Sequence, residues 1–212
     1  MRNESTARYT VSGISDVLRN RNAGFLGYHR AVETAVLVAL KQQQGVLHVL
    51  FERRSFSLRR QPGEISFPGG HVEATDRSQL HAAVRETGEE LGINQDTIRV
   101  LGSLDIFPAS SGLLVYPYVG FLPDDAILRP NPKEVANILS VPLQTLLEHE
   151  PDMYRVHLQP EFPEDFPFHL IPNGRAYPFR TDTQVQYFYQ FDDFVVWGLT
   201  AKVLTHFLDL LR

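Results

Sequence analysis

Three glutamates, Glu86, Glu89 and Glu90, lie close together in the stretch VRETGEELGI, directly after Arg85. Residues three and four positions apart share one face of an α-helix, so these carboxylates would lie side by side and repel one another. Carboxylate oxygens are also ligands that Mg²⁺ prefers, with water and phosphate oxygens completing the coordination shell. The cluster therefore indicates either a solvated acidic face or a site for divalent cations.

The segment before these glutamates favours the cation site. An apolar, strand-like run ends in Pro68-Gly69-Gly70. Two consecutive glycines permit backbone conformations and close approaches that side chains forbid. A strand, a glycine loop and a carboxylate-bearing helix in series could hold cations against a phosphate, and the cations would relieve the repulsion among the glutamates.

The expected helix has recognisable limits and a packed side. Asp76 and Ser78 are both suitable N-caps, and Gly92 follows Leu91 as a C-terminal stop. Four residues lie roughly opposite the glutamates, on the side that we expect to be buried: Leu80, Val84, Thr87 and Leu91. The helix is thus predicted to have one packed face and one acidic face.

This part of the chain resembles the signature of the Nudix hydrolases, which cleave nucleoside diphosphates linked to another moiety. The matching positions are Gly70, Arg85, Glu86, Glu89, Glu90, Gly92 and Ile93. Arg85 follows Gly70 by fifteen residues, one more than in the general pattern, and Asp76 stands near the place of the first glutamate of that pattern. The extra residue is expected in the loop before the helix, which leaves the role of Asp76 open.

The stretch LFERRSFSLRRQPGEISFPGG, residues 50–70, resembles a further signature, that of the coenzyme A pyrophosphatases within the Nudix hydrolases. The matching positions are Arg54, Ser55, Arg59, Gly63, Phe67, Pro68, Gly69 and Gly70. The Leu-Leu-Thr that usually begins this signature is replaced by Leu50, Phe51 and Glu52. The segment FVVWGLTAKVL, residues 194–204, also resembles the part of the chain that closes the domain in this subfamily.

The first resemblance implies a metal-dependent mechanism in which Mg²⁺ or Mn²⁺ is held by the motif. Its implied ligands are Glu86, Glu89, Glu90 and the carbonyl of Gly69. Glu89 is the first choice for the base that takes a proton from the attacking water, and Glu134, in NPKEVANI, is the second. Arg85 is expected to pair with a glutamate of the motif and to hold the cluster in place.

The second resemblance implies that the substrate is coenzyme A or an acyl or oxidised derivative, cleaved to 3′,5′-ADP and a 4′-phosphopantetheine moiety. Arg54 and Arg59 are the candidates for binding its phosphates, with Ser66 and Phe67 near the site. Other nucleoside diphosphate derivatives, namely ADP-ribose, NADH and dinucleoside polyphosphates, are alternatives. A non-catalytic ligand-sensing module is another, although a module without activity could lose a motif glutamate and all three are present here.

Composition narrows the class of protein. The 212 residues include no cysteine, which excludes disulfides, thiol catalysis and a cysteine-based zinc site. A formal net charge of −5 argues against a general nucleic-acid binder. The first ten residues have no apolar core like that of a signal peptide, and AVLVAL is too short to span a bilayer, so we expect no membrane association and a cytoplasmic location.

Four arginines gather before the glycines, at positions 53, 54, 59 and 60, in an otherwise acidic protein. Guanidinium groups bind phosphate in a bidentate manner, so this loop suits a multiply phosphorylated small molecule. A loop that only improves solubility is the alternative.

The order of elements predicts an α+β fold or an α/β/α sandwich with a mixed β-sheet, in a single domain of residues 1–212. This matches the Nudix-type α/β/α sandwich that the resemblance implies. Strands are expected at 30–40, 46–54, 98–106, 114–121 and 185–191, with QQQG as a hairpin turn after the first and FPASSG as a loop. Besides the glutamate helix, helices are expected at 11–21, 143–149 and 195–211. Residues 1–28 would form a helical N-terminal extension.

Residues 159–182 are rich in proline and aromatic side chains, at a density that excludes a central strand or helix. This insertion is expected to form a surface hairpin that turns at Pro172-Asn173-Gly174. It could instead be a lid or a homodimer contact that offers Phe166, Phe168, Tyr177 and Phe179 to a ligand or partner.

Overall fold

The computed structural model describes residues 10–21, 25–28, 31–109 and 112–212 of the chain. A mixed sheet of eight strands forms its centre, in the order β3-β2-β1-β7-β5. These strands are β1 (Val32–Gln43), β2 (Val46–Arg54), β3 (Ile65–Ser66), β5 (Arg99–Ser103) and β7 (Leu113–Leu122). Three further strands complete it: β4 (Gly69–His71) pairs with β1, β6 (Phe107–Ala109) with β7, and β8 (Val135–Pro142) with β2.

The sheet is mixed because β1 pairs in parallel with β7 and antiparallel with β2 and β4. The turn between β1 and β2 has positive φ angles at both Gln44 and Gly45, 51° and 82°, as a two-residue hairpin turn of the primed type requires. The hairpin predicted from QQQG is therefore confirmed.

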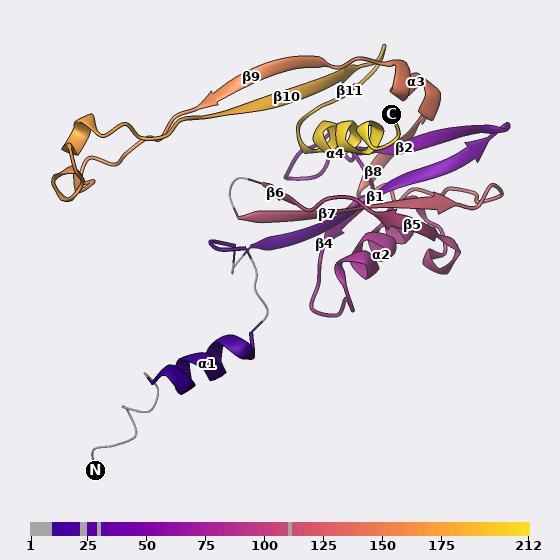
Figure 1. Ribbon diagram of the computed structural model, residues 1–212. Helices are drawn as coiled ribbons and strands as arrows, with labels where there is room; N and C mark the ends of the chain where they lie inside the picture. The colour runs from indigo at the N-terminus through magenta and orange to yellow at the C-terminus, as the bar shows by residue number, and fades with distance from the viewer. Residues whose placement is uncertain (1–9, 22–24, 29–30, 110–111) are drawn as a thin grey trace.

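Helices cover both faces of this sheet, as Figure 1 shows for α2 (Gln79–Leu91) and α4 (Gly198–Asp209). Alternate residues of β1 point to the two sides: Val38 packs in the cluster that contains α4, whereas Leu37 and Ala39 pack with Leu91 of α2. A short helix, α3 (Leu143–Glu148), adds Leu146 to the α4 side. The α/β/α sandwich predicted from the sequence is confirmed.

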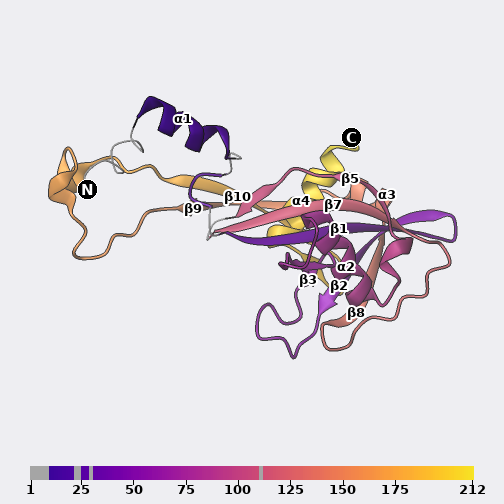
Figure 2. The ribbon, with the colours of Figure 1, turned by 90° about the horizontal axis from the view of Figure 1, so that it is seen from below.

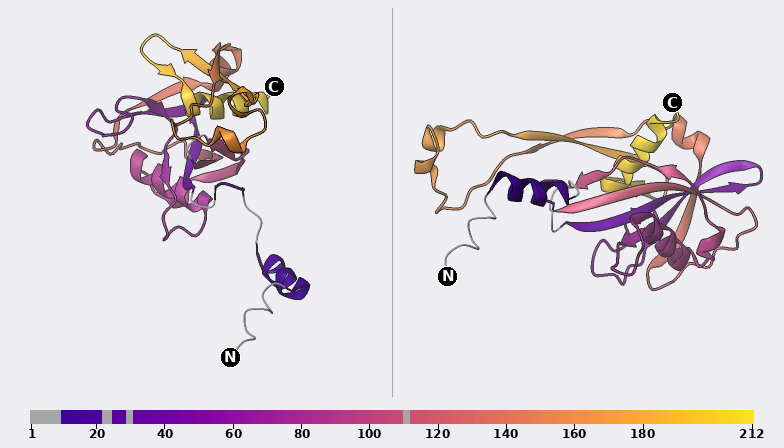
Figure 3. Two further views of the ribbon diagram at one scale, coloured as in Figure 1. Left: turned by 90° about the vertical axis from the view of Figure 1, so that its left-hand side faces the viewer. Right: turned by 60° about the horizontal axis from the view of Figure 1, so that its bottom comes forward.

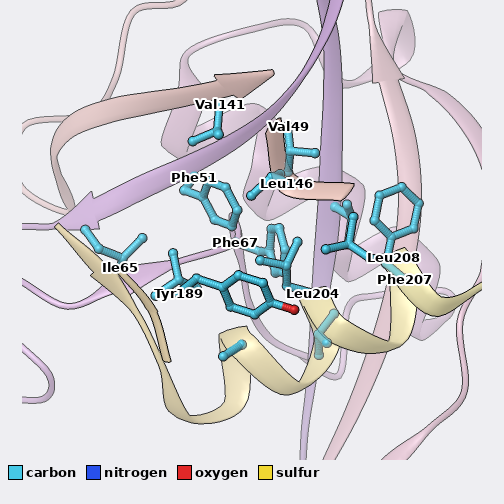
Figure 4. Close-up of a cluster of buried hydrophobic side chains, with 14 of the residues drawn as sticks. Val49, Phe51, Ile65, Phe67, Val141, Leu146, Tyr189, Leu204, Phe207 and Leu208 are labelled. Carbon is cyan, nitrogen blue, oxygen red and sulfur yellow. The ribbon is translucent and has the colours of Figure 1, made fainter. Parts of the chain in front are cut away.

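The larger core cluster lies between the sheet and α4. Figure 4 shows Phe51 and Phe67 beside Tyr189 and Leu204 in this cluster. The rings of Phe51 and Phe67 stack with centroids 5.0 Å apart. The β3 strand and the start of the glycine loop are thereby fixed to the sheet by apolar packing.

A long hairpin of β9 (Asp152–Leu158) and β10 (Asp182–Gln190) extends well beyond the end of the central sheet (Figures 1 and 2). A two-residue strand, β11 (Val195–Val196), pairs with the base of β10. The tip holds two 3₁₀ turns, Phe168–Leu170 and Gly174–Ala176, and the chain reverses at Asn173 with φ of 65°. The predicted surface hairpin and its turn are thus present, and no β-strand or α-helix forms among the prolines.

The N-terminal extension forms α1 (Val11–Arg19), capped by the Thr10 hydroxyl, which accepts a hydrogen bond from the Gly13 amide. Figure 3 shows it standing apart from the sheet, and none of its residues is buried. Its apolar side chains include Val11, Ile14, Val17 and Leu18, all exposed.

Several predicted boundaries were wrong. The last helix starts at Gly198 instead of residue 195, because residues 195–196 pair with β10. Half of the expected FPASSG loop is the strand β6, which extends the ladder on β7. Strands β8 and β9 were not predicted, and a further 3₁₀ turn, Gln95–Thr97, precedes β5.

Candidate active site

Helix α2 carries the three glutamates and has the caps that the sequence predicts, but its buried face differs from the expected one. The Ser78 hydroxyl accepts from the His81 amide, and Gly92 ends the helix with φ of 64°. The buried residues are Ala82, Ala83, Thr87, Gly88, Glu90 and Leu91. The prediction of one acidic face opposite one packed face was therefore wrong for Glu90, which lies on the packed side.

Glu90 is held against the glycine loop. It is only 5% exposed, and its Oε2 accepts a hydrogen bond of 2.8 Å from the Gly69 amide. Burial and the neighbouring carboxyl of Glu52 raise the pKa of Glu90 well above its usual value. Without a cation, therefore, this carboxyl favours its protonated form.

The two glycines are needed for the backbone to come this close. A Cβ on Gly69, whose φ is +146°, would lie 2.3 Å from the carbonyl oxygen of Ala35. A Cβ on Gly70 would lie 2.5 Å from the carboxyl carbon of Glu86. The backbone at Gly70 thus packs directly against the Glu86 carboxylate, which is half-buried and has a raised pKa because of that burial.

Glu52, which the sequence analysis did not assign to the site, lies beside Glu90. It comes from the middle of β2, is 1% exposed, and its Oε1 accepts a hydrogen bond of 3.1 Å from the Ser66 hydroxyl. The carboxyl of Glu90 is within hydrogen-bonding reach. Its Oε2 is buried without a partner, and burial raises the pKa of this carboxyl.

Arg85 binds the acids on the outer side of the helix. Its guanidinium lies 3.1 Å from Glu86 and 3.3 Å from Glu89, so the expected pairing with a motif glutamate is present, and it also binds Asp76 through Nε and Nη2. The Asp76 side chain is 1% exposed. Hydrogen bonds from Arg85 hold the pKa of Asp76 well below its usual range, and the same contact raises the pKa of Arg85.

The two candidate bases differ in position. Glu89 is more than half exposed and pairs with Arg85. Glu134 lies just before β8, where its backbone carbonyl accepts from the Ser55 amide and its Oε2 from Asn131. The charge of Glu134 raises the pKa of the carboxyls of Glu52, Glu86 and Glu90.

Arg53 and Arg54, at the end of β2, point to opposite faces of the sheet. The charge of Arg54 lowers the pKa of Glu52, which places it on the carboxylate side, and its Nε is buried without a partner. Arg53 points to the other face, where its Nη2 donates to the backbone oxygen of Asp193. Arg59 is exposed on the loop.

Ser66 and Phe67 were both expected near the site, but only Ser66 lies beside the carboxylates. Ser66 binds Glu52, as described above. Phe67 is 3% exposed and packs in the core on the α4 side, so its predicted contact with substrate is replaced by a structural role. Consecutive residues of an extended strand point to opposite faces, which separates the two.

Two surface hollows lie near these elements. One, of about 240 Å³, is lined by Arg53, Gly63, Phe194 and Trp197 on the α4 side. The other, of about 650 Å³, begins at Gln79 in the first turn of α2 and is lined by aromatic and apolar side chains: Phe25, Leu104, Ile106, Tyr116 and Tyr118. The larger hollow has room for part of a small organic molecule.

The donor set suits a hard divalent cation. Within the described part of the chain, no group of three or more His, Cys, Asp or Glu side chains is placed to hold a metal ion by itself. Mg²⁺ and Mn²⁺ are commonly bound by a few carboxylates, with water and substrate oxygens filling the remaining positions. The partnerless Glu52 Oε2, buried among acids, is the kind of atom that such a cation would satisfy.

Comparison with known proteins decides the family. A family model described as the NUDIX domain matches residues 29–159, more than half of the chain. The chain belongs to the Nudix family. Its signature residues are those on α2 and the glycine loop.

Relatives of this Nudix protein share most of its length. A protein of Photorhabdus laumondii, named "Uncharacterized Nudix hydrolase NudL", is 35% identical over 74% of this chain and 73% of its own. An Escherichia coli protein of the same name is 29% identical over 83% of this chain and 80% of its own. The chain is a Nudix hydrolase.

A solved structure supports the Nudix fold. The crystal structure of a MutT/nudix family protein from Enterococcus faecalis superimposes with a TM-score of 0.52 at 13% identity, covering all of this chain and 75% of its own. At that identity the likeness concerns the fold alone. No helix among the described residues combines the length and apolar character needed to cross a membrane.

Proposed function

We propose that this Nudix hydrolase is a pyrophosphohydrolase, dependent on Mg²⁺ or Mn²⁺, that cleaves the diphosphate of coenzyme A or a derivative to 3′,5′-ADP and a 4′-phosphopantetheine species. One observation carries the proposal. The carboxylates of Glu52, Glu86 and Glu90 gather beside Gly69 and Gly70, and the partly unpaired guanidinium of Arg54 lies on the same face.

The metal would be held by Glu86, Glu89, Glu90 and the carbonyl of Gly69. When bound, it would neutralise charge on the diphosphate oxygens and lower the pKa of a bound water. Arg85 positions Glu86 and Glu89 through its ion pairs, and it is itself fixed by Asp76. The helix, the glycine loop and Arg85 would thus position these ligands before substrate binds.

The proton of the attacking water would go to Glu89 or Glu134. Glu89 has the accessibility of a base and is paired with Arg85. The second choice, Glu134, is supported because it is exposed and its charge acts on the carboxyls of Glu52, Glu86 and Glu90. Separate Glu89→Gln and Glu134→Gln variants would distinguish them by the acidic limb of the pH profile of kcat.

The substrate assignment draws on the arginine loop. Arg54, with a buried Nε that lacks a partner, and exposed Arg59 would bind phosphate groups, since guanidinium groups bind phosphates in a bidentate manner. Ser66 would lie next to the reacting phosphates through its bond to Glu52. Coenzyme A carries a 3′-phosphate besides its diphosphate, so a loop with several arginines fits it well.

A homodimer through the β9–β10 hairpin is part of the proposal. A two-stranded ribbon is marginally stable alone in water, and no strand of the described chain pairs with the second edge of β9. On the outer face of the hairpin, the rings of Tyr154 and Phe188 are in contact. The ring of Phe188 also stacks on Trp197, with an angle of 9° between the two rings. A second copy offers the same edge and the same apolar face, as an isologous interface requires.

The test is hydrolysis of coenzyme A, acetyl-coenzyme A, ADP-ribose, NADH and a dinucleoside polyphosphate, each with Mg²⁺, Mn²⁺ or EDTA, with chromatographic analysis of products. Metal-dependent release of 3′,5′-ADP from coenzyme A in preference to the others is the expected result. Preference for ADP-ribose or another compound would support the proposed hydrolysis of a diphosphate but reject coenzyme A as the substrate. No cleavage of any compound would favour a ligand-sensing module instead.

A further inference from the structure

Glu52 is the position at which this chain departs from the subfamily it resembles. The usual residue there is threonine, which offers a neutral hydroxyl, whereas Glu52 offers two oxygens and a charge. The side chain lies in the middle of β2 and is 1% exposed. A charged residue at so buried a position requires compensation from its surroundings.

The surroundings of Glu52 provide only part of that compensation. Ser66 donates one hydrogen bond to Oε1, and the charge of Arg54 acts from the end of the same strand. Oε2 has no hydrogen-bond partner. Besides Arg54, the groups that act on this carboxyl are two acids: Glu90 through a hydrogen bond and Glu134 through its charge, so Arg54 supplies the positive charge by itself among the groups that act on it.

The neighbouring Glu90 is likewise compensated only in part. Its Oε2 is held by the Gly69 amide, a neutral donor, and Glu52, Glu86 and Glu134 act on it from the other sides. A divalent cation satisfies both oxygens at once, because carboxylates are its usual ligands.

We propose that Glu52 is a cation ligand, which with Glu90 forms a divalent-cation subsite on the buried side of the Nudix helix. The inference rests on the proposed metal dependence and extends it to a residue outside the motif. The subsite places an anionic oxygen where threonine would leave a hydroxyl. It therefore binds Mn²⁺ or Mg²⁺ more tightly than the motif glutamates alone.

Two substitutions test this ligand role. Glu52→Thr restores the residue usual in the subfamily, and Glu52→Gln keeps the shape and can still accept from Ser66 while donating to Glu90. The matched control is Glu64→Gln, since Glu64 also precedes the glycine loop but is bonded to Gln61. Circular dichroism and thermal unfolding establish that each variant is folded.

Binding is measured by titrating Mn²⁺ into each protein without substrate and following the free ion by electron paramagnetic resonance. Both Glu52 variants are expected to weaken the tightest Mn²⁺ binding by more than about a hundredfold, beyond the roughly 10- to 100-fold that loss of an outer-shell partner costs, with the control unchanged. Binding within about twofold of wild type in both variants would overturn the inference and leave the metal dependence standing.

Two further outcomes are informative. If Glu52→Thr weakens binding but Glu52→Gln does not, Glu52 only positions Glu90 by hydrogen bonding, and the ligand role is rejected. If the wild-type protein itself binds no Mn²⁺ at millimolar concentration, the inference and the proposed metal dependence fail together. A weakening in Glu52→Thr alone would still be consistent with the proposed metal-dependent hydrolysis.

Discussion

The guanidinium of Arg85 donates two hydrogen bonds to the carboxylate of Asp76, at 3.0 Å from Nε and 2.9 Å from Nη2. Asp76 lies in the loop before α2, nine residues earlier, and also lies 2.7 Å from the Nδ1 atom of His81. The residue whose role the sequence left open therefore anchors the arginine that pairs with Glu86 and Glu89. The loop, with its one extra residue, is tied to the helix at this point.

Replacing Asp76 by Asn should destabilise the protein by about 2 kcal/mol, because the Asp76 carboxylate is lost from a nearly buried charge pair. The free energy of unfolding from urea denaturation checks this, with exposed Asp96→Asn as the control. The effect should be pH-dependent. Since the folded pKa of Asp76 is depressed, its contribution is present above the ordinary value of 3.8 and is lost as the pH falls through the folded pKa. An equal difference between the two proteins at pH 7 and pH 2 would contradict this account.

Replacing Glu90 by Gln should reduce kcat by about 10³-fold while the protein stays folded, because the amide keeps the shape but removes a charge from the metal site. The Gly69 amide can still donate to the amide oxygen of the glutamine, so the loop should hold its position. Steady-state kinetics with saturating Mg²⁺ measure the loss. Glu148→Gln, on α3, is the control, and near-normal turnover in Glu90→Gln would remove the metal-site interpretation.

Stability without metal should fall as the pH rises from 4.5 towards 7. Burial raises the pKa of Glu52 from 4.5 to about 7, so in that window the folded protein binds more protons at this group than the unfolded chain does. The carboxyls of Glu86 and Glu90 act in the same direction. Because Mg²⁺ replaces the missing protons and binds the folded state, it should raise Tm more at pH 8 than at pH 5. Thermal unfolding in EDTA and in Mg²⁺ at both pH values tests this, and a Mg²⁺ effect independent of pH would refute it.

Replacing Arg54 by Gln should raise KM for the phosphorylated substrate by about ten- to a hundredfold, the effect of one or two charge-assisted hydrogen bonds. Arg53→Gln is the matched control, since Arg53 is adjacent in sequence but binds the backbone of Asp193 on the other face. Initial-rate kinetics on the substrate chosen by the panel measure both variants. Equal effects of the two substitutions would show that the loop acts only through its total charge.

Replacing residues 162–179 by Asn-Gly should change the oligomeric state or the affinity for substrate, because it removes the aromatic tip of the hairpin. The ring cluster lost comprises Phe162, Phe166, Phe168, Tyr177 and Phe179. Sedimentation velocity and kinetics are the measurements. A second variant, Tyr154→Ser with Val156→Ser on the outer face of β9, tests the dimer contact without altering the tip. Unchanged sedimentation and kinetics in both variants would leave the hairpin without the proposed role.

Local rules predicted the elements whose limits are set by neighbouring residues. Ser78 and Gly92 bound α2 because capping depends on the residues of a single turn, and the β1–β2 hairpin follows from Gln44 and Gly45. The motif glutamates were found because their spacing is regular. These features need no knowledge of distant segments.

Long-range packing explains what was missed. Glu52 could be recognised as unusual only by its charge within the apolar run of β2, and its contact with Glu90 depends on how α2 crosses the sheet. Phe67 was assigned to the site because it is part of the signature, although its neighbour Ser66 is the residue that faces the carboxylates. Strand β9 was missed although Tyr154, Val156 and Leu158 alternate with polar residues, and its pairing depends on β10 further along the chain.

Helix α4 packs its Leu204, Phe207 and Leu208 against the same core as Val38 of β1. During synthesis, β1, β2 and α2 leave the ribosome well before α4, so one face of the central sheet has no cover until the helix emerges. The parallel pairing of β1 with β7, which aligns Val38 with Val119, also joins segments far apart in the sequence. Contacts of such separation slow folding, and transiently exposed apolar sheet surface favours aggregation. We therefore expect the nascent chain to depend on chaperones until α4 is available to close the core.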